Sequence, residues 1–347
     1  MRHGIKTFFF LFTLAMLSGC ARIAPTLQRT PKLHTVAFYN TENLYDTRND
    51  PKADDDGFTP DGLMQWDEDR YKTKIKNLAT VIESIGGKDS PPVLLGLCEV
   101  ENRQVLEDLV ASSPLRKRRY DIIHYDSPDP EGLDVALLYN PRVFKPTAQT
   151  SLPIKFQEKG FASRDILQVK GMLQGQPVTV YVNHWPEDRG SASLGDSRRL
   201  AAAAALRGHI DTQLKADKNA HILVLGDFAD EPKSTTMERV LRATGRPNPA
   251  YQNELFNTFY LWYIQGRGSF HTRNDNQMLD QILISKSFLS GSGLEFVRGS
   301  ATIHDPEFSK FTFGKYKDTP RRSYSGSLYL GGYSDHFPVY IKLQQVK

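Results

Sequence analysis

Acidic, amide and imidazole side chains follow several short apolar runs of the sequence, each typical of a buried strand. They occur in Phe-Tyr-Asn-Thr-Glu-Asn at 38–43, Leu-Cys-Glu-Val-Glu at 97–101, Val-Asn-His-Trp-Pro at 182–186, Leu-Gly-Asp-Phe-Ala-Asp at 225–230, Leu-Asp-Gln-Ile at 279–282 and Ser-Asp-His-Phe-Pro at 334–338. Strand ends are positions where a sheet holds reactive groups rigidly. Any one of these endings alone is more often an ordinary turn, so the prediction depends on the whole set.

The residue types in this set favour divalent-metal chemistry. Glu99, Asp227, Asp280 and Asp335 would repel one another if the fold brought them together, and their pKa values would rise. A hard divalent cation relieves such repulsion and prefers oxygen ligands. The chain has only two cysteines and no clustered set of histidines, which argues against structural zinc.

In this order along the chain, the set resembles the endonuclease/exonuclease/phosphatase superfamily, whose members are deoxyribonuclease I-like. The most characteristic matches are Leu-Asp-Gln-Ile-Leu-Ile at 279–284 and Ser-Asp-His-Phe-Pro-Val at 334–339. Asn-Thr-Glu-Asn-Leu-Tyr-Asp at 40–46, Cys-Glu-Val-Glu-Asn at 98–102 and Val-Asn-His-Trp-Pro at 182–186 are similar to secreted bacterial members. The resemblance runs from about residue 34 to the C-terminus. It implies an α/β fold, a four-layer α-β-β-α sandwich of two mixed β-sheets flanked by helices, and Mg²⁺ or Mn²⁺ as cofactor.

The resemblance also implies a role for each polar residue in metal-assisted phosphoester hydrolysis. The expected metal ligands are Asn40, Glu99 and Asp335, although Asn40 is alternatively a phosphate contact. The expected catalytic residues are His184, Asp227, Asp280 and His336. Asp227 would orient or deprotonate water, Asp280 would fix the tautomer of His336, and His184 would donate to the phosphoryl or leaving oxygen. Asn183, Glu42 and Asp134 are expected near the substrate.

Two positions depart from the pattern of the superfamily. Ala229 occupies the position of the final Asn in the usual Gly-Asp-Phe-Asn motif, and its methyl group cannot replace the hydrogen bonds of the Asn amide. Losing an oriented donor of this kind costs on the order of 10²–10³ in rate. Glu131, before Gly132, stands where secreted relatives often carry Arg, so an expected phosphate contact is missing.

Three functions remain open. An extracytoplasmic endonuclease acting on nucleic-acid phosphodiesters is the first expectation, by analogy with the secreted relatives. A phospholipid or inositol/sugar phosphate esterase is the second, and a catalytically weakened surface binding protein, suggested by Ala229, is the third. The net charge is +4, and +2 without Arg2 and Lys6, so a strongly cationic nucleic-acid binder is not indicated. We expect a monomer.

The N-terminus has the pattern of a bacterial lipoprotein signal. Basic residues precede the apolar run 8–17, and Leu-Ser-Gly-Cys ends at Cys20, the expected lipidation site. The alternative is an ordinary signal peptide with a chance cysteine. We expect a signal peptide at 1–19, a tether at 20–32 and one catalytic domain at 33–347. The mature protein would then be lipid-anchored in the cell envelope, at the outer membrane or cell surface of a bacterium.

The elements that must position these residues can also be predicted. Apolar runs rich in β-branched and aromatic residues predict strands at 34–39, 93–98, 120–124, 134–139, 178–183, 221–225, 279–284 and 337–343. Apolar residues at spacings of three and four predict a helix over 71–85. The Ala-rich segment predicts a second helix over 197–214, with Asp196 as N-cap. The acidic segment 48–69 reads as a long loop, and Cys98 as a buried, inert thiol.

Overall fold

Two large mixed β-sheets pack face to face in the computed structural model, which describes Met1 and residues 32–187, 192–246, 253–272, 275–291 and 293–346. The first sheet has the order β14-β18-β1-β2-β4-β3, and β15 also pairs with β18. Its strands are β1 (Leu33–Leu44), β2 (Pro92–Val100), β3 (Asp121–His124), β4 (Asp134–Tyr139), β14 (Gly293–Phe296), β15 (Thr302–Ile303) and β18 (Val339–Val346). The neighbours β1 and β2 are parallel, and the remaining pairs are antiparallel.

The second sheet has the order β5-β6-β7-β8-β13-β10-β9. Its strands are β5 (Phe144–Leu152), β6 (Ile166–Leu173), β7 (Gln176–His184), β8 (His221–Asp227), β9 (Ala243–Thr244), β10 (Leu255–Asn257) and β13 (Asp280–Ser285). Two small hairpins complete the strands, β11 (Phe270–His271) with β12 (Asn276–Gln277) and β16 (Tyr324–Ser325) with β17 (Leu328–Tyr329). The neighbours β7 and β8 are parallel.

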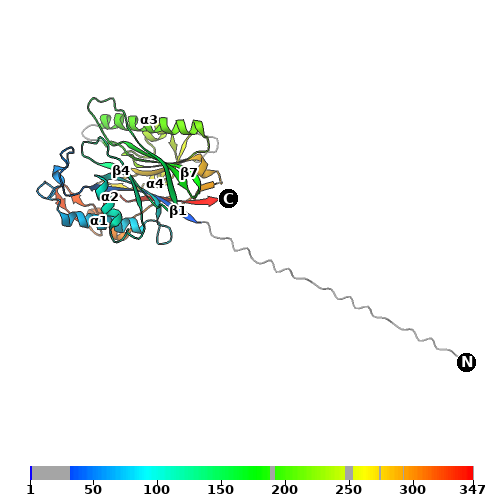
Figure 1. The fold of residues 1–347 in the computed structure, drawn as a ribbon, viewed down its shortest axis with the longest axis horizontal. Helices are drawn as coiled ribbons and strands as arrows, with labels where there is room; N and C mark the ends of the chain where they lie inside the picture. Colours follow the sequence, from blue (N-terminus) through cyan, green and yellow to red (C-terminus); the bar gives the residue numbers. More distant parts are fainter. Residues whose placement is uncertain (2–31, 188–191, 247–252, 273–274, 292, 347) are drawn as a thin grey trace. The chain divides into compact units, whose positions relative to one another are not determined.

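Helices cover the outer faces of both sheets. The α-helices are α1 (Glu68–Ser84), α2 (Arg103–Ala111), α3 (Ala192–Ala216) and α4 (Tyr260–Ile264). Short turns of other helix types are η1 (Asp56–Phe58), η2 (Thr236–Leu241), η3 (Lys286–Leu289), η4 (Glu307–Ser309) and η5 (Gly314–Tyr316). Figure 1 shows α1 and α2 on one side of the sheets and α3 on the other. Among the described helices, none is both long enough and apolar enough to cross a membrane.

Three apolar clusters hold the layers together. One lies between the sheets, a second joins the first sheet to α1 and α2, and a third joins the second sheet to α3. Gly96 of β2 shows how closely the sheets approach, because a Cβ there would lie 2.9 Å from the Phe38 ring and 3.2 Å from Val182 of the opposite sheet. The predicted four-layer sandwich is therefore confirmed.

All eight predicted strands are present, although their bounds differ by a few residues. The predicted helix at 71–85 is α1, and Asp67 caps it by accepting a hydrogen bond from Arg70 N. The predicted N-cap at Asp196 is wrong, because α3 already begins at Ala192 and the Asp196 carboxylate pairs with Arg199. The expected signal peptide at 1–19, Cys20 and the tether up to residue 31 lie outside the described residues, Met1 apart.

Candidate active site

The strand register brings the predicted catalytic residues of the second sheet to one end of it. Asp227 ends β8, where it lies opposite Asp280 at the start of the antiparallel β13 and opposite His184 at the end of the parallel β7. In the first sheet, Asn40 of β1 lies opposite Cys98, one residue before Glu99 of β2. Because the two sheets are stacked, these strand ends meet at one edge of the sandwich.

His336 lies between two of these carboxylates. Its Nδ1 is 2.6 Å from Asp280 Oδ2, and its Nε2 is 3.8 Å from Asp227 Oδ2. Burial by itself lowers the pKa of His336, but the charges of Asp280, Asp227 and Asp335 outweigh it and raise the pKa well above 6.5. These carboxylates therefore favour the protonated imidazole, and Asp280 holds its orientation.

Backbone and side-chain hydrogen bonds fix the segment that carries Asp335 and His336. Ser334 Oγ donates to the carbonyl oxygen of Asn40 at 2.8 Å and accepts from His336 N at 3.1 Å. The ring of Phe270 lies against the His336 ring, with centroids 4.7 Å apart. The segment before β18 is thus attached both to β1 and to the β11–β12 hairpin.

Glu99 and Asp227 are joined by the amide of Asn40. Asn40 Nδ2 donates to Glu99 Oε1 at 2.8 Å and to Asp227 Oδ2 at 3.0 Å, while Asn40 Oδ1 accepts from Glu42 N at 2.9 Å. In this orientation the Asn40 oxygen is turned to the backbone, and its role as a metal ligand stays a prediction. The amide instead sets the distance between two carboxylates.

Burial shifts the acid–base behaviour of the carboxylates. It raises the pKa of Glu99 to about 8, and the charges of Asp335 and Glu187 add to the shift. It also raises the pKa of Asp335 to about 6, with a further contribution from Glu42. Asp227 is shifted in the same direction, first by burial and then by Asp280. Each of these groups would gain from a bound cation.

His184 also faces the acidic end of the site. The side chain is buried, and its Nε2 lies 3.8 Å from Glu99 Oε1 and 4.0 Å from Glu187 Oε1. Its neighbour Asn183 points elsewhere, because Asn183 Nδ2 donates to Leu225 O at 3.2 Å and Asn183 Oδ1 accepts from Trp185 Nε1 at 3.3 Å. Its amide links β7 to β8, and a contact of Asn183 with substrate stays a prediction.

Two further residues expected near the substrate have other partners. Glu42 Oε2 lies 3.2 Å from Lys74 Nζ and accepts from Ser323 N at 2.7 Å. Asp134 is buried and bonds His124 Nε2 at 2.9 Å and Ser127 N at 2.8 Å. Neither residue is among those that line the cavity, and their contact with substrate stays a prediction.

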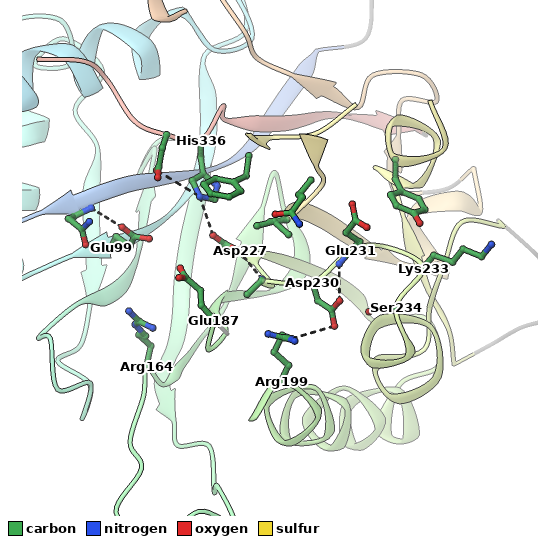
Figure 2. Close-up of a pocket in the computed structure, with 17 residues that line it drawn as sticks. Glu99, Arg164, Glu187, Arg199, Asp227, Asp230, Glu231, Lys233, Ser234 and His336 are labelled. Atoms are coloured by element: carbon green, nitrogen blue, oxygen red, sulfur yellow. Dashed lines mark hydrogen bonds and ion pairs between the residues drawn. The ribbon is translucent and has the colours of Figure 1, made fainter. Parts of the chain in front are cut away.

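Several of the predicted catalytic and metal-binding groups open into a cavity of about 700 Å³ (Figure 2), whereas His184 and Asp280 are not among its lining residues. Glu99, Asp227 and His336 lie at one end of the cavity, which Asp335 also lines. The remaining lining includes Arg199 and Asp230, and sequence reasoning missed most of its other members, which include Arg164, Glu187, Glu231, Lys233, Ser234, Tyr263, Phe270 and Gln277. Most of these residues lie in loops, where no apolar periodicity marks a position.

The acidic end of the cavity has the donor chemistry of a divalent-cation site. Within the described residues, one group whose ligand atoms lie within 4.8 Å of one another is Glu99, His184 and Glu187, and another is Asp227, Asp280 and His336. The first offers two carboxylates and an imidazole. The second is less suitable, because its imidazole Nδ1 is already bonded to Asp280. Glu99 and its neighbours therefore fit the implied metal best.

Comparison with known proteins agrees with this fold. A crystal structure of an endonuclease/exonuclease/phosphatase family protein from Bacteroides thetaiotaomicron matches with 16% sequence identity and a TM-score of 0.55. The match covers 90% of this chain and 98% of that chain. The human nocturnin catalytic domain matches with 15% identity, 91% and 95% coverage and a TM-score of 0.54. A mannosyl-6-phosphatase from B. thetaiotaomicron matches with 16% identity, 89% and 99% coverage and a TM-score of 0.54. A search of curated proteins gave no match.

These solved structures share the fold of this chain, and its sequence identifies the family. Residues 35–345 match the profile described as "Endonuclease/Exonuclease/phosphatase family". This range covers both sheets and every residue of the candidate active site. The chain belongs to the endonuclease/exonuclease/phosphatase family, a superfamily of phosphoester hydrolases.

Proposed function

We propose that this protein is a divalent-metal-dependent phosphoesterase that attacks phosphorus with an activated water molecule. The observation that carries the proposal is the position of His336, held by Asp280 at 2.6 Å and 3.8 Å from Asp227, in one cavity with Glu99 and Asp335. Charged donor, acceptor and metal-ligand groups are thereby grouped around a space large enough for a phosphate ester.

Glu99 and Asp335 would hold the cation, with Glu187 beside them. The raised pKa values of Glu99 and Asp335 support this assignment, because burial and like charges both disfavour their ionised forms and a bound cation would offset both effects. When bound, Mg²⁺ or Mn²⁺ polarises the phosphoryl group and stabilises the charge that develops during displacement.

The remaining residues divide the proton transfers. Asp227 is the base: its raised pKa makes it a better proton acceptor than an ordinary Asp, and Ala229 N and Asn40 Nδ2 fix its two oxygens. As the water oxygen bonds to phosphorus and its proton passes to Asp227, the bond between phosphorus and the leaving oxygen breaks, and the leaving oxygen takes up a proton from solvent. His336 donates through Nε2 to a phosphoryl oxygen. His184 donates a hydrogen bond toward the leaving oxygen.

The first candidate substrate is a nucleic-acid phosphodiester, cleaved outside the cytoplasm by a protein attached to the envelope through Cys20. Membership of the family and the likeness to secreted bacterial members support this proposal. The cations Arg164, Arg199 and Lys233 also line the cavity and suit an anionic backbone.

The composition of the cavity favours a second candidate, a phosphate ester of a small hydroxyl-rich molecule such as a sugar phosphate. Beyond the acidic end, the wall offers Asp230, Glu231, Ser234 and Gln277 with the ring of Tyr263. These groups suit hydroxyls, whereas the two carboxylates would repel the flanking phosphates of a polynucleotide. One structural neighbour is named a mannosyl-6-phosphatase.

One substrate panel distinguishes these candidates. The mature domain is incubated with plasmid DNA, RNA, sphingomyelin, inositol phosphates and mannose 6-phosphate, in Mg²⁺, in Mn²⁺ and in chelator. We expect metal-dependent cleavage that His336→Ala abolishes and that His209→Ala, on α3 outside the cavity, leaves unchanged. If no ester is cleaved with either metal, the hydrolase proposal fails, and the weakened binding protein suggested by Ala229 takes its place.

A further inference from the structure

A buried arginine lines the catalytic end of the cavity. Arg164 lies two residues before β6, and only 7% of its side chain is exposed. It nevertheless lines the cavity together with Glu99, Asp227 and His336, and Figure 2 shows it pointing toward Glu187. A cation in this position would meet any anion that reaches the catalytic groups.

The turn between β3 and β4 holds the guanidinium in place. Arg164 Nε lies 3.1 Å from Asp129 Oδ2, and Arg164 Nη2 lies 3.5 Å from Glu131 Oε2. The turn is itself fixed, because Asp129 Oδ1 accepts from Glu131 N at 3.0 Å and Tyr45 Oη donates to Glu131 O at 3.0 Å. The arginine therefore does not have to reorganise when a ligand binds.

These ion pairs use only part of the guanidinium. Asp129 and Glu131 lie beside Nε and Nη2, but Nε makes no hydrogen bond, and among the described residues none accepts a hydrogen bond from Arg164 Nη1. Arginine presents five N–H donors in a planar fork that matches the oxygen geometry of phosphate. Nη1 is thus the group that remains for a ligand in the cavity.

We propose that Arg164 binds a non-bridging phosphoryl oxygen of the substrate, with Asp129 and Glu131 as positioning residues. The inference rests on the proposed function, since it names the residue that recognises the phosphoryl group whatever the leaving group is. Arg164 acts in addition to the metal and His336. The two carboxylates behind it keep the free arginine from pairing instead with Glu99 or Glu187.

Inorganic phosphate is the probe that tests this proposal. Its affinity is measured by calorimetry in Mg²⁺ for the wild type, Arg164→Met and Arg164→Lys, alongside kcat and KM. The matched control is Arg118→Met, because Arg118 makes a two-pronged pair with Glu83 outside the cavity. We expect Arg164→Met to weaken phosphate binding about 10- to 100-fold, as for a lost hydrogen bond between charged groups. Arg164→Lys should give an intermediate loss, and Arg118→Met no change.

Equal phosphate affinities in the wild type and Arg164→Met would overturn the proposal. If Arg164→Met does not fold, Arg164→Lys decides the question, because it keeps the charge and the ion pairs but loses the fork; a wild-type affinity there refutes the assignment of Nη1. The phosphate measurement requires no turnover. A protein that binds phosphate through Arg164 but cleaves nothing would therefore disprove the hydrolase proposal and leave the arginine assignment standing.

Discussion

Replacing Glu99 with glutamine should make the metal-free protein more stable at alkaline pH while removing its activity. Glu99 is 8% exposed, and burial, Asp335 and Glu187 together raise its pKa from 4.5 to about 8. A group whose folded-state pKa is raised contributes stability below its unfolded pKa and loses it as pH rises through the folded value. The wild type should therefore lose stability between pH 4.5 and 8 unless a cation is bound.

The size of this effect follows from the two pKa values. One pKa unit corresponds to about 1.4 kcal/mol, so the interval from 4.5 to about 8 is worth about 5 kcal/mol. Most of this loss is complete at pH 8. The glutamine is neutral throughout and keeps the acceptor for Asn40 Nδ2, although its NH₂ group then faces the donor Asn43 N. That contact costs about 1–3 kcal/mol. The net gain of Glu99→Gln at pH 8 is therefore about 2–4 kcal/mol.

Denaturant unfolding at pH 5, 6, 7 and 8 measures the effect. In chelator, the difference in unfolding free energy between Glu99→Gln and the wild type should grow in favour of the variant as the pH rises. In Mn²⁺ the difference should shrink or reverse, because the cation stabilises the ionised wild type by mass action. Glu295→Gln, a carboxylate of β14 outside the cavity, is the control.

Parallel pH curves for the two proteins in chelator would refute the reasoning. They would mean that Glu99 ionises in the folded protein as it does in the unfolded chain. If the curves diverge in chelator and Mn²⁺ does not change the difference, Glu99 is a buried carboxylate with a raised pKa, but it does not bind the metal.

The other predictions concern three residues around the site. Asp280→Asn removes the carboxylate bonded to His336, and we expect kcat to fall about 10²- to 10⁴-fold with little change in fold, measured by steady-state kinetics and circular dichroism. Ala229→Asn should raise kcat about tenfold or more, since it adds a donor to the cavity where the backbone φ of 47° suits asparagine; an unchanged rate would show that the amide is dispensable. Lys74→Met leaves the buried Glu42 without its cation and should cost about 3–5 kcal/mol of unfolding free energy; a loss below about 1 kcal/mol would contradict a buried ion pair.

There are identifiable physical reasons why some strands were not predicted from the sequence. β5 reads Phe-Lys-Pro-Thr-Ala-Gln-Thr-Ser-Leu and is largely exposed, so it lacks the alternation of a half-buried strand. It tolerates Pro146 because it is an edge strand with a register shift between Pro146 and Ala148. Gly171 of β6 has a tertiary role, since a Cβ there would lie 2.4 Å from the Phe144 ring. The strands in the middle of both sheets are apolar runs and were predictable.

Residue types predicted which side chains gather at the site, but not their individual partners. Asp227 and Asp280 meet because strand pairing fixes their register, whereas His336 reaches them from the segment before β18 of the other sheet. Asn183 occupies an equally suggestive position, yet its amide bonds Leu225 O within the sheet. Glu131 breaks the expected pattern, and only the fold shows that it contacts Arg164 from 33 positions away. Ion pairs between loops leave no periodic signal in a sequence.

Backbone conformation explains much of what residue types could not predict. Among the described residues, Glu42, Asn43, Glu99 and Ala229 have φ values of 53°, 55°, 59° and 47°, in the left-handed region that non-glycine residues avoid. Such conformations are sparsely populated and persist where the surrounding structure enforces them. In these conformations Asn43 N donates a hydrogen bond to Glu99 Oε2 at 2.8 Å, and Ala229 N donates one to Asp227 Oδ1 at 2.9 Å. Strained backbone at strand ends therefore sets the orientation of both carboxylates. A sequence pattern of polar residues after apolar runs does not predict that strain.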